Sequence, residues 1–430
     1  MFIARFTERP YQDPDSGFFG NTGRPVQDLA LSNGEYNAVL GGQLYNRYLD
    51  EWVTAEDVGF DGLMLNEHHS TPFCMGGAMN VEASILARIT KRAKIVLLGN
   101  VLPIWDDPLW LAEQLAMIDM ISGGRLVAGW VRGTGRESVA HNSPAPFNWE
   151  RFQEAHDFIV KAWTTPGPFR WESEHYSYRY VNPWARPIQQ PTPPMWVPGV
   201  MSRNTVKWAA EHRYPYVMLG GFALAKPCFD YYKEVAEQNE YEFGPQHVGF
   251  MFKVHLEATD ELALETARKY VEGPGNIFLE GSRGIANPAV QNLPGLSDRK
   301  NLLPTREDRF LAASRGRTVS DGNGAKRAGP PLPNAQSFEA QIESSAIVAG
   351  TPKSVLPKIR RVLEELRPGH VMFWDGDGAM THEDSMRSLK LWRDVIPAVR
   401  EIADELDLPS SFEVDPKTNM RVGEPAATRV

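Results

Sequence analysis

Residues 93–133 read AKIVLLGNVLPIWDDPLWLAEQLAMIDMISGGRLVAGWVRG, and this stretch decides the fold. The run from Ala93 to Gly99 is apolar enough to be a strand buried on both faces, as strands of parallel sheets are. Pro108 begins a helix that ends at Gly123, and Arg125 to Val131 is a second apolar run. Strand, helix and strand in this order predict a βα unit of a parallel sheet.

The same alternation continues on both sides of this stretch. The other predicted strands are Phe2 to Phe6, Gly62 to Leu65, Met195 to Val200, Tyr216 to Leu219, Val248 to Glu257 and His370 to Trp374. The other predicted helices are Leu44 to Val58, Val81 to Thr90, Trp149 to Trp163, Arg203 to Glu211, Phe229 to Asn239, Glu261 to Val271, Thr351 to Leu366 and His382 to Leu406. Eight strands alternating with helices favour a TIM (β/α)8 barrel. An open doubly wound sheet is disfavoured because no glycine-rich fingerprint follows the first strand.

Three segments depart from this alternation. The aromatic stretch 169–184 predicts a hairpin laid across one end of the barrel. Residues 273–336 are rich in Gly, Pro, Lys and Arg, and they predict a long late insertion over the C-terminal barrel face, either as a solvated loop or as a lid. The polar tail at 407–430 has little to bury. We therefore expect one barrel domain over residues 1–406, followed by this tail.

Composition excludes several classes of protein. The 430 residues carry 45 Lys and Arg against 54 Asp and Glu, and the net charge of −9 is the wrong sign for a nucleic-acid-binding surface. No window approaches the roughly 18 apolar residues that a membrane helix needs. Cys74 and Cys228 are far apart, and the first residues lack the apolar core of a secretory signal. We expect a cytoplasmic protein with reduced thiols and with neither a nucleic-acid nor a membrane partner.

Polar residues follow the strand ends, where a barrel places its active site. Asn66, Glu67, His68 and His69 come directly after the predicted strand Gly62 to Leu65. The Glu-His-His triplet could form a metal site, supply a general base, or be a satisfied polar pair. No HxH or HExxH spacing occurs in the chain, so we expect no metal. Histidine suits a base because its unperturbed pKa of about 6.5 lets it take and give a proton near neutrality.

Two further strand ends indicate a phosphate site. Ser202 is predicted to cap the helix that follows Met201, with Thr205 three residues later. Backbone N–H groups at a helix start attract anions, although an ordinary capped helix has the same pattern. Arg132, after the fourth strand, adds a fixed cation. Together these residues predict a barrel that grips one phosphate from two sides.

The strand that begins at Ala93 ends with Gly99 and Asn100. The glycine permits an unusual backbone, and the asparagine amide offers donors and an acceptor to the edge of a heteroaromatic ring. A plain strand-ending turn is the alternative. Aromatic residues that could wall a flat cofactor or an apolar substrate, although most such residues pack in the core, are Trp105, Trp130, Tyr176, Tyr178, Tyr180 and Trp184.

These segments, in this order, resemble the bacterial luciferase-like family of flavin-dependent monooxygenases. The resemblance covers about Tyr45 to Val271 and Ile347 to Ile402. Its motifs are GFDGLMLNEHH, the helix ending in ISGGRL, the VRG after it, the segment ending in WAAEH, and IVAGTPKSV through DVIPAV. The resemblance implies a TIM barrel with a late insertion. It also implies reduced FMN (FMNH2) as cofactor, delivered by a separate NAD(P)H:flavin reductase.

The resemblance further implies roles for individual residues. His68 matches the catalytic base of the EHH motif, with Glu67 and His69 on either side of it. Arg132 matches the arginine that reaches the FMN phosphate. The other cofactor-binding matches are Met201, Ser202 and Thr205 at the phosphate, and Gly99 and Asn100 at the isoalloxazine, beside a non-proline cis bond that occurs in some members.

The implied chemistry is that of a monooxygenase. It would use O2 and a flavin C4a-hydroperoxide to oxygenate a small apolar or ring-containing substrate. The luciferases carry a cysteine near the reactive flavin carbon, and Val131 holds that position here, so light emission and an aldehyde substrate are not implied. The alternatives are a deazaflavin-dependent hydride transferase and a non-catalytic flavin-binding protein. Family barrels pair through helices near the early strands, so a homodimer is expected.

Overall fold

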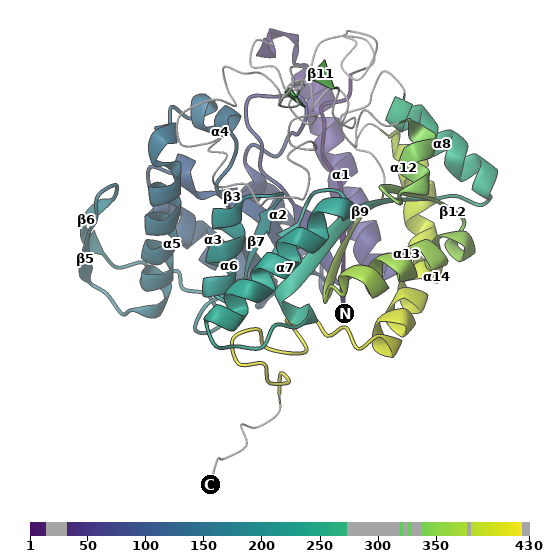
Figure 1. Ribbon diagram of the computed structural model, residues 1–430. Coiled ribbons are helices and arrows are strands. Elements are labelled where there is room, and N and C mark those ends of the chain that lie inside the picture. The colour runs from purple at the N-terminus through teal and green to yellow at the C-terminus, as the bar shows by residue number, and fades with distance from the viewer. Residues whose placement is uncertain (14–31, 273–318, 321–325, 328–336, 376–379, 424–430) are drawn as a thin grey trace.

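The computed structural model describes residues 1–13, 32–272, 319–320, 326–327, 337–375 and 380–423 (Figure 1). At its centre, parallel strands form a sheet that closes on itself. In order around the barrel they are β1 (Phe2–Phe6), β2 (Gly62–Leu65), β3 (Lys94–Val101), β4 (Leu126–Val131), β7 (Met195–Gly199), β8 (Tyr216–Met218), β9 (Val248–Leu256) and β13 (His370–Trp374). The predicted TIM barrel is confirmed, and all eight predicted strands are present.

A ninth strand, β12 (Ile347–Gly350), joins the sheet on β9 and was not predicted from periodicity. The short β8 pairs with β9 only as far as Phe250, whereas β12 pairs with Lys253 to Leu256. Lys253 also pairs with Trp374 of β13, so β12 lies on the β8 side of β9. The shortness of β8 therefore leaves room for β12 towards the C-terminal end of the barrel.

Helices surround the barrel (Figure 1). The long ones are α1 (Ala38–Val58), α2 (Met79–Ile89), α3 (Pro108–Ser122), α5 (Asn148–Thr164), α6 (Arg203–Glu211), α7 (Phe222–Gln238), α8 (Asp260–Glu272), α13 (Pro352–Leu366) and α14 (His382–Glu405). The short ones are α4 (Gly135–Ala140) and α12 (Phe338–Glu343), with 3-10 turns η1 (Asn33–Glu35), η2 (Leu102–Ile104), η3 (Ala145–Phe147) and η4 (Pro245–His247). In the described chain, no helix combines the length and apolarity that crossing a bilayer requires.

Two helices begin several residues before their predicted starts. Asn37 caps α1, and its side chain accepts hydrogen bonds from two backbone N–H groups of the first turn. This cap offsets the poor helix propensity of Gly41 and Gly42. In α7, Pro227 lies inside the helix rather than ahead of it. Both helices therefore continue through Gly or Pro residues that usually end or interrupt a helix.

Side chains alternate between the barrel interior and the surrounding helices, as strands buried on both faces require. The inward side chains form one cluster, which consists of Phe2, Ala4, Phe6, Met64, Val96, Leu98, Val127, Trp196, Val217, Met251, Met372 and Trp374. Their strand neighbours, such as Ile3, Leu63 and Ile95, are buried under the helices. Because side chains fill the barrel, a ligand site is expected at its C-terminal end rather than within it.

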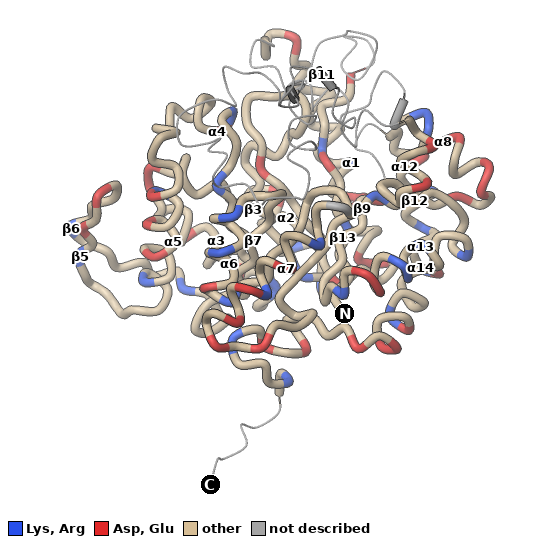
Figure 2. Tube along the Cα trace, viewed as in Figure 1, with Lys and Arg blue, Asp and Glu red and all other residues tan. Residues whose placement is uncertain are grey.

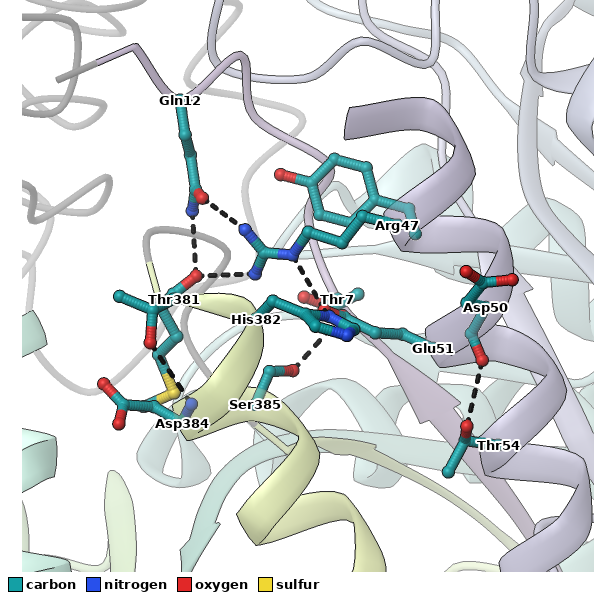
Figure 3. Close-up of polar contacts among 12 residues, drawn as sticks. Thr7, Gln12, Arg47, Asp50, Glu51, Thr54, Thr381, His382, Asp384 and Ser385 are labelled. Carbon is teal, nitrogen blue, oxygen red and sulfur yellow. Dashed lines mark hydrogen bonds and ion pairs between the residues drawn. The ribbon is translucent and has the colours of Figure 1, made fainter. Parts of the chain in front are cut away.

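An ion cluster joins the first long helix, α1, to the last, α14 (Figure 3). Glu51 of α1 accepts hydrogen bonds from Arg47 Nε at 2.8 Å and from His382 Nδ1 of α14 at 2.9 Å. Arg5 of β1 lies 3.4 Å from Glu51 and 2.8 Å from Asp375, which follows β13. Burial alone would raise the pKa of Glu51, but the hydrogen bond from His382 and the charges of Arg5 and Arg47 lower it to about 2. The cluster thus ties together the two ends of the barrel wall.

Charges of both signs are interspersed over the outer helices (Figure 2). Several form i,i+4 pairs, such as Lys207 with Glu211 and Arg361 with Glu365. Such exposed pairs contribute little stability each. Along the trace, Lys and Arg alternate with Asp and Glu, and the expected lack of a nucleic-acid partner stays a prediction.

The prediction that the C-terminal tail has little to bury is wrong for its first part. Leu408 and Ser410 are buried, and the ring of Phe412 lies 4.9 Å from that of Phe2 and 5.9 Å from that of Trp196. Residues 408–412 therefore cover the N-terminal end of the barrel. The sequence does not indicate this packing, because the tail has few apolar residues among many polar ones. Some of these polar residues, such as Ser411, hydrogen-bond to the end of the barrel.

The aromatic hairpin is present, but its predicted place across a barrel end is wrong. β5 (Phe169–Glu172) and β6 (Ser177–Val181) pair antiparallel. Tyr178 stacks on Phe158 of α5 at 4.6 Å, and its hydroxyl donates a hydrogen bond to Asp107 before α3 at 2.8 Å. The hairpin therefore lies on the flank of the barrel, outside α5 (Figure 1). The alternating aromatic residues of the hairpin, Trp171 and Tyr178, pack against Phe158 of α5.

The predicted basic insertion at 273–336 lies outside the described residues, apart from two short strands. These are β10 (Val319–Ser320) and β11 (Lys326–Arg327), which pair antiparallel. Its role as a lid stays a prediction.

Replacing Phe412 with alanine should lower the free energy of unfolding by about 1–3 kcal/mol, because a partly buried ring is lost from the barrel end. Urea denaturation measures this difference. The matched control is Val422→Ala, in the same tail, whose side chain is 59% exposed and whose loss should cost less than about 0.5 kcal/mol. Equal stability of the two variants would contradict the conclusion that residues 408–412 stabilise the N-terminal end of the barrel.

Candidate active site

The predicted site residues lie at the C-terminal ends of four neighbouring strands. The order β2, β3, β4, β7 is set by parallel pairing along the sheet. The segments concerned are 66–69 after β2, 99–100 at the end of β3, 132–137 after β4 and 201–205 after β7. Because the strands are parallel, these segments meet on one face of the barrel.

His68 forms an ion pair with a residue that was not predicted. Its Nδ1 lies 3.0 Å from Glu137 Oε1. The Glu137 side chain is 1% exposed, whereas that of His68 is 27% exposed and can reach a ligand. Glu137 is itself fixed by the start of α4, where the backbone N–H of Thr134 donates to Glu137 Oε2 at 3.0 Å and its hydroxyl donates to the same oxygen.

This pairing controls the protonation of both groups. Burial alone would raise the pKa of Glu137, but the hydrogen bond and charge of His68 and the hydrogen bond from Thr134 lower it to about 2. Burial alone would lower the pKa of His68, but the hydrogen bond to Glu137 and its charge, together with Glu8, raise it above 6.5. Glu137 is therefore ionised near neutrality, and His68 exchanges its proton at a pH above that of an ordinary histidine.

Glu67 and His69 bind each other instead. Glu67 Oε1 lies 2.9 Å from His69 Nε2, and Glu67 Oε2 accepts a hydrogen bond from the Val101 N–H at 2.8 Å. The His69 ring lies 4.1 Å from that of His141. These contacts fasten the segment after β2 to β3. A direct catalytic role for Glu67 and His69 stays a prediction.

A second carboxyl near His68 comes from the end of β1 and was also missed. Glu8 is buried and accepts a hydrogen bond from Asn66 Nδ2 at 2.8 Å. Arg9 donates to Asn66 Oδ1 at 3.0 Å, which fixes the amide. Burial raises the pKa of Glu8, and the charge of His68 opposes this.

The missed residues differ in how visible they are in sequence. Thr134 and Glu137 have the spacing of a capping box, which predicts a helix start at that point. That pattern could have located Glu137 beside the candidate phosphate residue Arg132. Glu8 carries no comparable signal, because it follows an ordinary strand.

The end of β3 provides a close approach and an unpartnered donor. The peptide bond between Leu98 and Gly99 is cis, although its second residue is not proline, and it lies at the position that the family resemblance indicated. A Cβ on Gly99 would lie 2.8 Å from the Gly129 carbonyl, so only glycine fits. Asn100 is 1% exposed, and its Nδ2 has no hydrogen-bond partner among the described residues. A buried amide in this state is suited to a ligand acceptor.

The end of β7 has the predicted helix start. Ser202 caps α6, and its side chain accepts a hydrogen bond from the Thr205 N–H at 3.3 Å. Met201 packs against the core, and Arg132 lies across the neighbouring strand end, half-buried. A helix start, a guanidinium and an unpartnered amide together fit a flat ring that carries a phosphate. FMN binding by these residues stays a prediction.

The aromatic residues proposed as pocket walls lie elsewhere in several cases. Trp130 is fully buried, with its ring 6.3 Å from that of Trp163. Tyr178 lies in the flanking hairpin, and Trp184 is 93% exposed. These three residues do not wall the mouth of the barrel.

A sequence model of the luciferase-like monooxygenase family matches residues 30–368. The chain belongs to this family. The oxygenase component of flavin-dependent trigonelline monooxygenase from Acinetobacter baylyi is 29% identical over 173 residues, 40% of this chain and 47% of that protein. The alkanal monooxygenase beta chain of Vibrio harveyi is 26% identical over 233 residues, 54% of this chain and 71% of that one. The chain thus spans about half the length of the first of these two relatives.

Two solved structures share the fold of this chain. A monooxygenase from Streptomyces bottropensis has a TM-score of 0.63 at 19% identity and covers 87% of this chain and 98% of its own. The oxygenating constituent of 3,6-diketocamphane monooxygenase from Pseudomonas putida, in complex with FMN, has a TM-score of 0.63 at 20% identity and covers 84% and 94%. At these identities the likeness shows the fold alone.

Replacing Glu137 with glutamine should lower the pKa of His68, because a neutral amide no longer stabilises the imidazolium. Histidine ring signals followed by NMR against pH measure this, with His68→Gln identifying the signal. The control Glu172→Gln removes an exposed carboxylate from the flanking hairpin and should leave the midpoint unchanged. If the midpoint is the same in E137Q as in the wild type, a group other than Glu137 sets the protonation of His68.

Proposed function

We propose that the protein is the oxygenase component of a two-component system. It would use FMNH2 and O2 to insert one oxygen atom into a small apolar or ring-containing organic molecule, with the flavin supplied by a separate NAD(P)H:flavin reductase. The observation that carries this proposal is the meeting of the His68–Glu137 pair, the unpartnered Asn100 amide and the capped start of α6 on one barrel face. The proposed location is the cytoplasm, where the two free cysteines stay reduced.

The cofactor would lie across the four strand ends. Arg132 and the α6 start, with Met201, Ser202 and Thr205, would hold the phosphate, while Gly99 and Asn100 would face the ring. Reduced FMN, when bound, supplies two electrons to O2, so that one oxygen atom enters the substrate and the other leaves as water. The residues of this chain bind, orient and exchange protons.

His68 is proposed as the general base. In its neutral form it would take a proton from the substrate or from the reacting oxygen, and Glu137, which stays ionised, would stabilise the resulting imidazolium. Directly below the mouth, the rings of Phe6 and Trp374 lie 4.9 Å apart in the apolar interior cluster with Leu98. This apolar floor favours an apolar substrate.

Oxygen uptake tests the proposal. The protein, FMN, NADH and a flavin reductase are combined with a panel of ketones, sulfonates, alkanes and aromatic amines. One O2 consumed per oxygenated product supports a monooxygenase. Substrate oxidation that needs a deazaflavin and no O2 would support hydride transfer instead. If the protein binds flavin but turns over no panel member, and no panel member raises O2 uptake, the result would indicate a non-catalytic flavin-binding protein.

Two variants should separate chemistry from binding. His68→Ala should slow oxygenation by about 100- to 10,000-fold with FMN affinity unchanged, because only a proton acceptor is lost. Arg132→Met should weaken FMN binding by about 10- to 100-fold, because a charged hydrogen bond to phosphate is lost. Flavin fluorescence titration and product formation measure the two effects. Turnover of H68A at the wild-type rate would remove His68 from the mechanism.

We also propose a homodimer formed through α2 and α3, which pack side by side. Exposed apolar side chains gather on this pair: Val81 (61%), Ile85 (40%) and Ile89 (45%) on α2, and Trp110 (61%), Met117 (51%), Met120 (39%) and Ile121 (47%) on α3. The α2 residues repeat every four positions and so form one stripe. An apolar surface of this kind indicates a partner, and a second copy would cover it symmetrically.

Replacing Ile85 with aspartate should convert the dimer to a monomer, because two carboxylates would be buried across the symmetric contact. Size-exclusion chromatography with light scattering gives the mass. Val139→Asp, at a 50% exposed position on α4, is the control and should remain dimeric. A wild-type monomer, or an I85D dimer of unchanged stability, would contradict this interface.

A further inference from the structure

Three side chains on the outer layer of the barrel form a cluster that the proposed reaction does not use. His156 and Asp157 lie on α5, and His212 is the C-cap of α6. One ligand atom from each lies within 4.8 Å of the other two. Ser202 and His212 are the two caps of α6, ten residues apart, so His212 lies about 15 Å along the helix from the proposed phosphate-binding start. The cluster is therefore separate from the candidate active site.

We propose that this cluster binds a transition-metal cation, Zn²⁺ or Ni²⁺, through two imidazole nitrogens and one carboxylate oxygen. Imidazole nitrogen is a ligand that these ions prefer, whereas Mg²⁺ and Ca²⁺ prefer oxygen alone. The site would link α5 to the end of α6. The expectation of no metal concerned the Glu67-His68-His69 segment, and it stays a prediction there.

His212 is arranged as a metal-binding histidine is. Its Nδ1 lies 2.8 Å from the Trp208 carbonyl oxygen, to which the ring N–H donates. This bond fixes the tautomer and leaves the Nε2 lone pair available. A ring N–H held by a backbone carbonyl is the usual outer contact of a histidine ligand. The side chain is half-buried, so an ion can reach it from solvent.

His156 provides the second nitrogen. Its ring is 3% exposed, so its position is fixed by the surrounding side chains. Its Nδ1 lies 2.9 Å from Asp157 Oδ1, and its Nε2 lies 3.1 Å from the Tyr214 hydroxyl. Because a carboxylate only accepts, the ring N–H on Nδ1 donates to Asp157 in this structure. Moving the ring proton to Nε2, from which it is donated to the Tyr214 hydroxyl, frees the Nδ1 lone pair for the cation without a net loss of a proton.

The remaining geometry requires a small movement of exposed groups. Tetrahedral coordination at about 2.0–2.2 Å brings ligand atoms to about 3.4 Å from one another. The Asp157 side chain is 62% exposed and His212 is half-buried, so both can close on the ion while His156 stays fixed. Solvent provides the fourth ligand. Lys417, whose Nζ lies 5.5 Å from the centre of the Tyr214 ring, is a nearby positive charge that weakens the site.

Titration of the metal-free full-length protein with ZnSO4, followed by calorimetry, tests this assignment. We expect one Zn²⁺ per chain, and at least about tenfold weaker binding in both Asp157→Asn and His212→Gln, with MgCl2 unable to compete. Both positions are exposed enough for the variants to fold, which circular dichroism verifies.

The matched control is His175→Gln. His175 belongs to the other cluster of this kind in the described chain, with Glu154 and Glu174, and its loss should leave Zn²⁺ binding unchanged. Absence of saturable Zn²⁺ binding by the wild type would overturn the proposal. So would binding that H175Q abolishes and that H212Q and D157N leave intact.

Discussion

The close approach of β3 to β4 is the constraint on which the candidate site depends. A Cβ on Gly99 would meet the Gly129 carbonyl at 2.8 Å, and one on Gly129 would meet the Leu97 carbonyl oxygen at 1.9 Å. Only glycine at both positions lets the strands lie this close. The pairing of Asn100 with Trp130 then sets the end of β3 beside the end of β4. The backbone register, more than any single side chain, determines which polar groups meet.

The ion pair between His68 and Glu137 depends on that register. The segment after β2 carries His68 and the segment after β4 carries Glu137, and they meet because β3 alone lies between their strands. The capping box at the start of α4 orients Glu137 before any ligand binds, so the carboxylate need not be ordered at the moment of reaction. The raised pKa of His68, whose side chain is 27% exposed, therefore depends on a buried carboxylate that a helix cap holds in place.

Sequence predicts what depends on local pattern. The strands, the cap at Ser202 and the position of the Glu-His-His triplet follow from periodicity and from residue type, and the structure has them. Contacts between residues far apart in the chain could not be predicted from local pattern. Glu137 contacts His68 across 69 positions of chain, and Phe412 packs against Phe2 from the opposite end of the chain. The aromatic hairpin lies on the flank of the barrel because Phe158 of α5 stacks on its Tyr178.

The account stands on one flavin lying across four strand ends, and a crystal structure of the protein with FMN tests that most directly. The predicted electron density has the phosphate between Arg132 and the N-terminus of α6, with the ring edge within hydrogen-bond distance of Asn100 Nδ2 and next to His68. Density for FMN at any other place on the barrel, or with its phosphate turned away from Arg132, would contradict the account.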